Sequence, residues 1–253
     1  MMYFLETLKY RNESLFYFGL LCFILAIIFL ILTRFTTTQV YNVNAWYKSF
    51  KFAASTVLFV WTMAWFIGYL IDFNATVFNW IIIITLGFEI IYITWQASRG
   101  SLSHFNVSTS FYAFMYSMMA LAATIATLAA AYIGILFLIN NFPDLPPYYV
   151  WSIRLGIFIF VVFAFEGFVM GSRMSHTIGG PDGEAGIPIL NWSKKFGDPR
   201  IAHFIGMHAL QVLPVLSYYL LRNTQLTIIV GILYFLLAVF TLMQALRGKS
   251  VFG

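Results

Sequence analysis

The chain has 253 residues, of which 61% are hydrophobic and only 9% are charged. Soluble globular domains carry about 25% charged residues, so this composition excludes an ordinary soluble domain. The net charge of +5 does not indicate a nucleic-acid partner, because in a membrane protein the cations report on the orientation of the loops. The one cysteine, Cys22, cannot form a disulfide within the chain.

The hydrophobic residues form seven segments, each long enough to cross a bilayer core of about 30 Å. Before them, residues 1–13 mix aromatic and charged positions, which predicts a short amphipathic helix at the membrane interface. We therefore predict an all-α fold, a seven-transmembrane-helix bundle that forms one membrane domain over residues 1–253. The spans are expected near residues 15–34, 52–72, 76–98, 109–139, 149–171, 202–221 and 225–246.

Seven crossings place the two termini on opposite sides of the membrane. The loops 35–51, 99–108 and 172–201 and residues 247–253 then share one side. With Arg34 at their border they hold ten cations, against four on the other side. Because cytoplasmic loops carry the excess of lysine and arginine, we expect the N-terminus outside and the C-terminus in the cytoplasm. The expected location is the plasma (inner) membrane of a prokaryote.

Two loops on the predicted cytoplasmic side resemble each other. Residues 44–52 read NAWYKSFKF and residues 191–196 read NWSKKF, and each precedes a span of the same orientation. This echo predicts a repeat of three helices, a connecting helix and three further helices. The alternative is that aromatic and basic residues recur at any cytoplasmic membrane boundary.

The longest polar interruption lies between Gly171 and Gln211. It contains three of the four histidines, three carboxylates and four cations. A long loop in a compact protein is usually either functional or disordered, and the prolines, glycines and apolar residues of this one argue against disorder. We therefore expect the functional chemistry here.

Two carboxylates lie within predicted spans. Glu89 precedes Arg99 by ten residues and Glu166 precedes Arg173 by seven, which places them about 15 Å and about 10 Å into the bilayer. A charge in lipid is costly, so such residues face the bundle interior, pair, or stay protonated. We expect both to carry function, with polar bonding between helices as the alternative.

The histidines suggest a metal or haem site, since imidazole suits zinc, copper and iron. The candidate metal ligands are His104, His176, His203 and His208. His203 and His208 are separated by about 140° around a straight helix, so they cannot point at one spot from the same helix. The chain has no HExxH and no CxxC motif that would make a metal site specific.

The leading hypothesis is an enzyme that acts on a membrane-soluble substrate with a bound metal ion or haem. The candidate catalytic residues are Glu89, Glu166, Asp182 and Glu184. The candidate residues for binding a cofactor or an anionic group are His104, His208, Gln211, Arg173 and Arg200. The expected partners are the lipid bilayer, an anionic or membrane-soluble small molecule and a second copy of the chain, but no nucleic acid.

Two other functions remain open. Intramembrane carboxylates with histidines towards the cytoplasm fit a proton relay, which predicts a proton-coupled transporter or channel that uses Glu89 and Glu166. Loop 172–201 fits a small membrane subunit or sensor that docks a cytoplasmic partner. A microbial rhodopsin is excluded, because the seventh span at 225–246 has no lysine to hold retinal.

Overall fold

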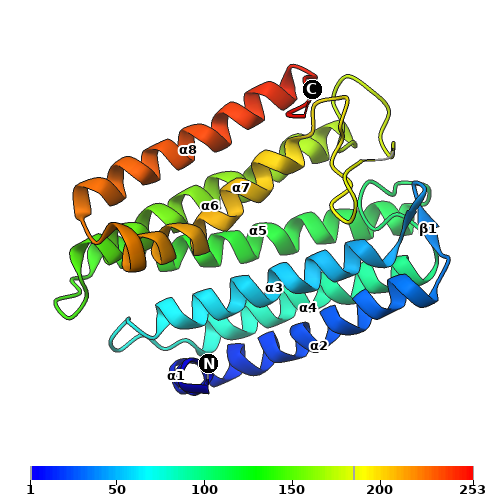
Figure 1. Ribbon diagram of the computed structural model, residues 1–253. Coiled ribbons are helices and arrows are strands. Elements are labelled where there is room, and N and C mark those ends of the chain that lie inside the picture. The colour runs from blue at the N-terminus through cyan, green and yellow to red at the C-terminus, as the bar shows by residue number, and fades with distance from the viewer. Residues whose placement is uncertain (1, 185, 253) are drawn as a thin grey trace. The chain divides into compact units, whose positions relative to one another are not determined.

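The structure is a computed structural model that describes residues 2–184 and 186–252. Within these residues, seven helices are long and apolar enough to cross a membrane. The predicted all-α fold with seven membrane-compatible helices is therefore confirmed (Figure 1). The orientation of these helices in a membrane stays a prediction.

The elements follow one another in simple order. The short helix α1 (Met2–Arg11) comes first, and the two-residue strands β1 (Gln39–Val40) and β2 (Val43–Asn44) pair antiparallel between the first two long helices. The long helices are α2 (Glu13–Phe35), α3 (Trp46–Ile67), α4 (Thr76–Ser98), α5 (Ser110–Ile139), α6 (Pro147–Arg173), α7 (Pro199–Leu216) and α8 (Thr224–Leu246). A π-helical turn, η1 (Ser217–Leu221), continues α7.

Helix α3 differs most from its predicted span, since it begins six residues before residue 52 and ends at Ile67 rather than at residue 72. It begins early because the Asn44 side chain accepts a hydrogen bond from Trp46 N–H (3.0 Å), which satisfies one of the free amides at a helix start. Beyond Ile67, the last turn tightens into 3₁₀-type bonds, including Leu70 N–H to Ile67 O (2.9 Å). The apolar pattern therefore marks only part of this helix.

The chain divides into two compact units, Met1–Ala129 and Ala130–Gly253, with the division inside α5. Each unit holds three consecutive long helices and part of α5. This order is the one that the echo between the two loops suggests. A symmetry between the units stays a prediction, and so does the single membrane domain.

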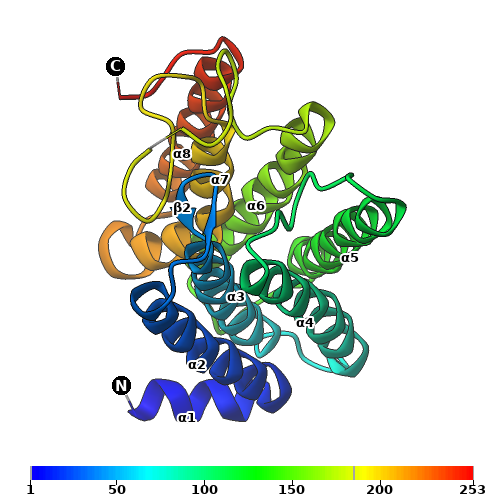
Figure 2. The ribbon, with the colours of Figure 1, turned by 90° about the vertical axis from the view of Figure 1, so that its right-hand side faces the viewer.

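In the first unit, α3 packs against both α2 and α4 (Figure 1). Two side-chain amides also join α2 to α4, because Asn12 Nδ2 donates to Asn79 Oδ1 (2.8 Å) and Asn79 Nδ2 donates to Asn12 Oδ1 (3.1 Å). Asn12 also caps α2, since its Oδ1 accepts from Leu15 N–H (3.1 Å). Helix α1 turns away from the axis of α2 (Figure 2), and its Arg11 guanidinium lies 4.0 Å from the centre of the Trp65 ring.

In the second unit, α6, α7 and α8 all contact one another. The backbones of α6 and α7 come close because glycines face the opposite helix. A Cβ added at Gly206 would overlap the Phe163 ring, and one added at Gly156 would lie 3.0 Å from Ala209 O. Small residues serve this purpose between membrane helices, where packing rather than the hydrophobic effect drives association. The buried apolar residues of this core are Ile159, Phe163, Ala202, Ala209, Leu213 and Ala238.

The end of α7 lies beside the start of α6. Pro214, inside α7, has no amide hydrogen to donate, and the chain passes from α7 into η1. The Ser217 hydroxyl in η1 donates to Tyr148 O (3.0 Å) and its oxygen lies 2.8 Å from Thr227 Oγ1 of α8. These contacts hold the start of α6, η1 and the start of α8 together at one end of the second unit.

Candidate functional site

The close contact between α6 and α7 brings Glu166 next to His203. Gly167 faces the imidazole, since a Cβ added there would make an ordinary van der Waals contact with His203 Cε1 (3.4 Å). His203 Nδ1 lies 3.3 Å from Glu166 Oε2, and the two side chains are 29% and 3% exposed. This distance suits an ion pair, but the atoms are not aligned for a hydrogen bond. Among the described residues, neither Glu166 oxygen nor His203 Nδ1 has a hydrogen-bond partner.

His208 lies on the same helix as His203 but has different neighbours. Its Nδ1 is 3.2 Å from Gln211 Oε1, and its ring packs edge-on against the Phe204 ring, with centroids 4.3 Å apart. The Trp192 ring from the loop also packs edge-on against Phe204, at 5.4 Å. The structure therefore brings His208 and Gln211 together, whereas His203 faces Glu166.

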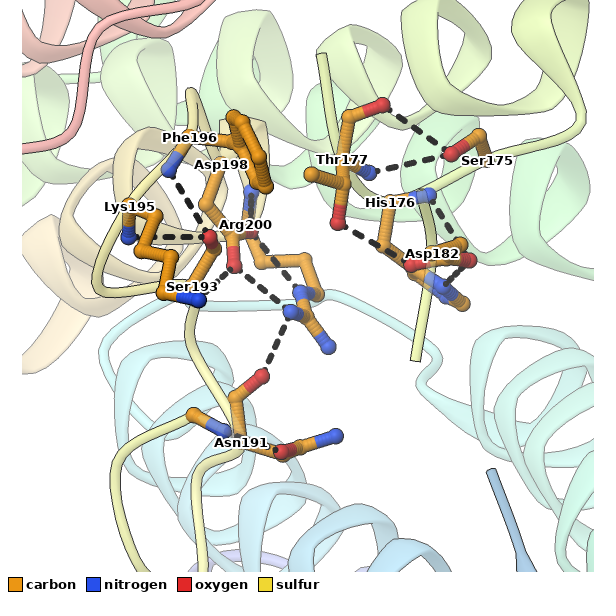
Figure 3. A network of polar contacts seen from close by, with 11 residues as sticks. Ser175, His176, Thr177, Asp182, Asn191, Ser193, Lys195, Phe196, Asp198 and Arg200 are labelled. Atoms are coloured by element: carbon orange, nitrogen blue, oxygen red, sulfur yellow. Dashed lines mark hydrogen bonds and ion pairs between the residues drawn. The ribbon is translucent and has the colours of Figure 1, made fainter. Parts of the chain in front are cut away.

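The loop between α6 and α7 holds His176 in a polar cluster of its own. Asp182 Oδ2 lies 2.9 Å from His176 Nδ1 and accepts from His176 N–H (3.2 Å), and Asp182 Oδ1 accepts from the Thr177 hydroxyl (3.1 Å) (Figure 3). Burial by itself raises the pKa of Asp182, but the hydrogen bonds and charge of His176 and the bond from Thr177 outweigh it. The pKa falls to about 2 from an ordinary 3.8. Asp182 is therefore a stable anion that anchors the loop.

Asp198 forms the second polar cluster, at the start of α7 (Figure 3). Its side chain is fully buried and accepts from Ser193 N–H (2.8 Å), Arg200 N–H (3.1 Å), Arg200 Nε (2.8 Å) and Arg200 Nη2 (2.6 Å). Arg200 Nη2 also donates to Asn191 O (2.6 Å). The Arg200 guanidinium is thus committed to fixing the loop onto α7, and the expectation that it binds a cofactor gains no support.

The other charged candidates of the loop lie at the surface. Glu184 Oε2 is 3.6 Å from Lys195 Nζ, and the side chains are 40% and 73% exposed. Arg173 is exposed at the end of α6, and no described carboxylate forms an ion pair with it. The loop itself is tied across its two ends, because Ile178 N–H donates to Gly197 O (2.9 Å) and Gly197 N–H donates to Ile178 O (3.1 Å). These two bonds join the segments on either side of the loop; its order stays a prediction from composition.

The remaining two candidates belong to the first unit. His104 lies in the connection after α4, where its Nδ1 is 3.1 Å from the Ser103 hydroxyl. Glu89 of α4 is 4% exposed, and its Oε1 has no hydrogen-bond partner among the described residues. Tyr92 lies one helical turn beyond Glu89, and Gln96 lies two turns beyond it. The Tyr92 hydroxyl accepts a hydrogen bond from Gln96 Nε2 (2.9 Å). Glu89, Tyr92 and Gln96 thus form a buried polar face of this helix.

Two buried polar groups of the first unit do not appear among the sequence candidates. Trp46 Nε1 and Ser49 Oγ in the first turn of α3 are buried without a described partner. They were missed because the predicted span begins at residue 52, which leaves them in a loop. A helical spacing of three to four residues continues from 46 through 49, 53 and 56, and this pattern is the signal that could have extended the helix.

The histidines do not gather into a metal site within the part of the chain that the structure describes. No group of three or more histidine, cysteine, aspartate and glutamate side chains there is arranged to hold a metal ion. The metal and haem hypotheses thus gain no support from these residues. Searches against family models, curated proteins and solved structures give no match to this chain.

Proposed function

We propose that this protein translocates protons across a membrane, as a proton-coupled transporter or a channel, and that Glu166 and His203 exchange the proton. The observation that carries the proposal is the Glu166 carboxylate. It lies in a membrane-compatible helix with 3% of its side chain exposed and 3.3 Å from an imidazole nitrogen. An ionisable residue within a membrane helix is by default a candidate for function, because burying it is costly.

The bonding of Glu166 differs from that of a structural carboxylate in the same unit. Asp198 accepts hydrogen bonds from Ser193 and Arg200 on both of its oxygens. Glu166 has no hydrogen bond on either oxygen within the described residues. A carboxylate held by several donors has its bonding capacity filled, whereas a buried carboxylate without hydrogen bonds calls for another role, and an imidazole beside it is a common proton shuttle. Asp198 therefore fits a role in structure, and Glu166 fits proton exchange.

The other titratable groups named on the helices that pack around the pair have partners of their own or are exposed, within the described residues. On α7, His208 bonds to Gln211 and Arg200 bonds to Asp198. On α8 the one titratable side chain is Tyr234, whose hydroxyl donates to Ile205 O (2.6 Å). On α6, Arg173 is exposed at the helix end. His203 is the described residue that lies within ion-pair distance of Glu166 (3.3 Å), so it is our candidate for sharing the proton.

Glu89 supplies a second buried carboxylate, in the first unit. Burial in a membrane helix gives it the same costly placement, so we propose it as a second proton-exchanging carboxylate, within the first unit. With the N-terminus outside, as the distribution of cations suggests, Glu166 and His203 would exchange protons towards the cytoplasmic side.

The test is proton flux in liposomes that contain the purified full-length chain and a trapped pH-sensitive dye. An imposed pH gradient with a potassium–valinomycin potential drives the flux. We expect Glu166→Gln and His203→Ala to slow the flux at least tenfold. Glu184→Gln removes an exposed carboxylate, so it serves as the control and should match the unmodified protein. Equal flux in Glu166→Gln and Glu184→Gln contradicts the proposal.

A second measurement separates this function from a metal enzyme. Infrared difference spectra between acid and neutral pH report directly on a carboxyl group that gains a proton inside the protein. We expect a protonated-carboxyl band that disappears in Glu166→Gln. Stoichiometric metal in the purified protein, together with unchanged spectra in that variant, would instead favour a metal enzyme.

A further inference from the structure

A small cavity lies in the second unit, where the loop after α5 meets the first two turns of α6. It has a volume of about 150 Å³ and is lined by Asn141, Phe142, Leu145, Pro147, Val150, Trp151 and Arg154. Lysine, aspartate and glutamate are absent from this lining, so Arg154 is the one charged group in it. The cavity lies at the opposite end of α6 from Glu166 and belongs to no site described above.

The Arg154 guanidinium is held in place from one side. Its Nε donates to Phe137 O in α5 (2.9 Å), and its Cζ lies 5.3 Å from the centre of the Trp151 ring. Among the described residues, its two terminal nitrogens have no acceptor. An arginine fixed through Nε and an aromatic face presents its remaining N–H groups in a planar fork. Such a fork matches the oxygens of a phosphate or carboxylate group.

The level of the cavity in the membrane also suits an anionic headgroup. Arg154 is seven residues beyond Pro147, about 10 Å along the helix. Side chains on a helix tilt towards its N-terminus, and long cationic side chains reach for the headgroup region. Phe137, whose carbonyl accepts from Arg154, is two residues from the end of α5. The guanidinium therefore lies near the end of both helices, where lipid phosphates are found.

We infer that this cavity binds a phosphate group, carried either by an anionic lipid or by free phosphate. Its volume of about 150 Å³ is well above the ~10–15 Å³ that one water molecule needs on such a measure, so a phosphate group fits in it. A lipid bound in this way leaves its acyl chains along the apolar surface of α6. This inference does not depend on the proposed proton function.

Arg222 offers a matched control for Arg154. It lies between η1 and α8, which the contacts of Ser217 place at the same end of the second unit. It is exposed, and its Nε donates to Tyr218 O (3.3 Å). Arg222→Gln removes the same charge from the same end of the unit without changing the cavity.

The experiment measures the unfolding temperature of the full-length protein in detergent during titration with three probes: inorganic phosphate, phosphatidylglycerol and diacylglycerol. We expect phosphatidylglycerol or phosphate to raise the temperature and diacylglycerol, which lacks phosphate, to have no effect. Arg154→Gln should weaken the effective probe at least tenfold, while Arg222→Gln should match the unmodified protein. A response to phosphatidylglycerol alone identifies a lipid headgroup, and one to both probes identifies the phosphate group itself.

Two results overturn the inference. One is equal affinity of Arg154→Gln and the unmodified protein for every probe, and the other is an equal response to diacylglycerol. If Arg154→Gln does not fold, Arg154→Lys keeps the charge but removes the planar fork. It should still weaken binding several-fold, and unchanged binding in that variant also overturns the inference.

Discussion

Asp198 provides the sharpest test of how the loop is fixed to α7. The variant Asp198→Asn keeps a side chain that caps a helix well, but it removes the negative charge beside Arg200. The side chain of Asp198 is 0% exposed and that of Arg200 is 23% exposed. Removal of one partner from a buried ion pair costs about 3–5 kcal/mol, because the other charge stays buried without compensation. Asp198→Ala should add about 1 kcal/mol through loss of the cap.

These energies predict a measurable difference between two loop carboxylates. For a chain of this size, 1 kcal/mol corresponds to about 2–4 °C in unfolding temperature, so Asp198→Asn should lower it by at least about 6 °C. The exposed pair of Glu184 and Lys195 contributes about 0–1 kcal/mol, so Glu184→Gln should change it by no more than about 4 °C. Tryptophan fluorescence during heating in detergent measures the unfolding temperature of each variant. If both variants lower the unfolding temperature by the same amount, the reasoning from burial is wrong.

Two further predictions concern helix packing and pH. Gly206→Ala places a methyl group against Phe163 and should cost about 1–3 kcal/mol. In Gly87→Ala the new Cβ meets nothing nearer than 4.0 Å, so this variant should stabilise the folded protein by up to about 1 kcal/mol. The unfolding temperatures of the two variants, measured in the same way, compare these effects. An equal drop in unfolding temperature for both would contradict the packing argument. Because the pKa of Asp182 falls from 3.8 to about 2 in the folded chain, its charge stabilises the loop by about 2 kcal/mol above pH 4 and loses this effect as the pH falls towards 2. Asp182→Asn should therefore lower hydrogen-exchange protection around His176 about thirtyfold at neutral pH, and unchanged protection would contradict the assigned pKa.

The fold was largely predictable from the sequence, because membrane helices follow from the length of apolar segments. With η1 counted as part of the sixth span, six of the seven spans lie within about three residues of their predicted limits. The exception, α3, carries Trp46 and Lys48 in its first turn, and such polar and aromatic residues at a helix start look like a loop when only hydropathy is considered. Hydropathy locates the part of a helix that meets lipid, not the part that extends beyond it.

The contacts of the candidate site were less predictable. The sequence indicates that Glu166 and His203 lie near one side of the membrane, but it does not say which histidine meets which carboxylate. That choice depends on the register between α6 and α7, in which Gly156 lies close to the Ala209 backbone and Gly206 makes room for the Phe163 ring. Likewise, Arg200 looks like an anion-binding residue until its bonds to Asp198 are seen. Such register and pairing are tertiary properties that a pattern along one chain does not encode.

The amide pair between Asn12 and Asn79 has a consequence for the order of events during synthesis. The two residues are 67 positions apart, so at about 5–20 residues per second the ribosome needs roughly 3–13 s to reach the second after the first. Until then, the Asn12 amide at the start of α2 is without its partner. The contact between α2 and α4 can therefore form only after the start of α4 has been synthesised, so α2 completes its packing later than its place in the chain suggests.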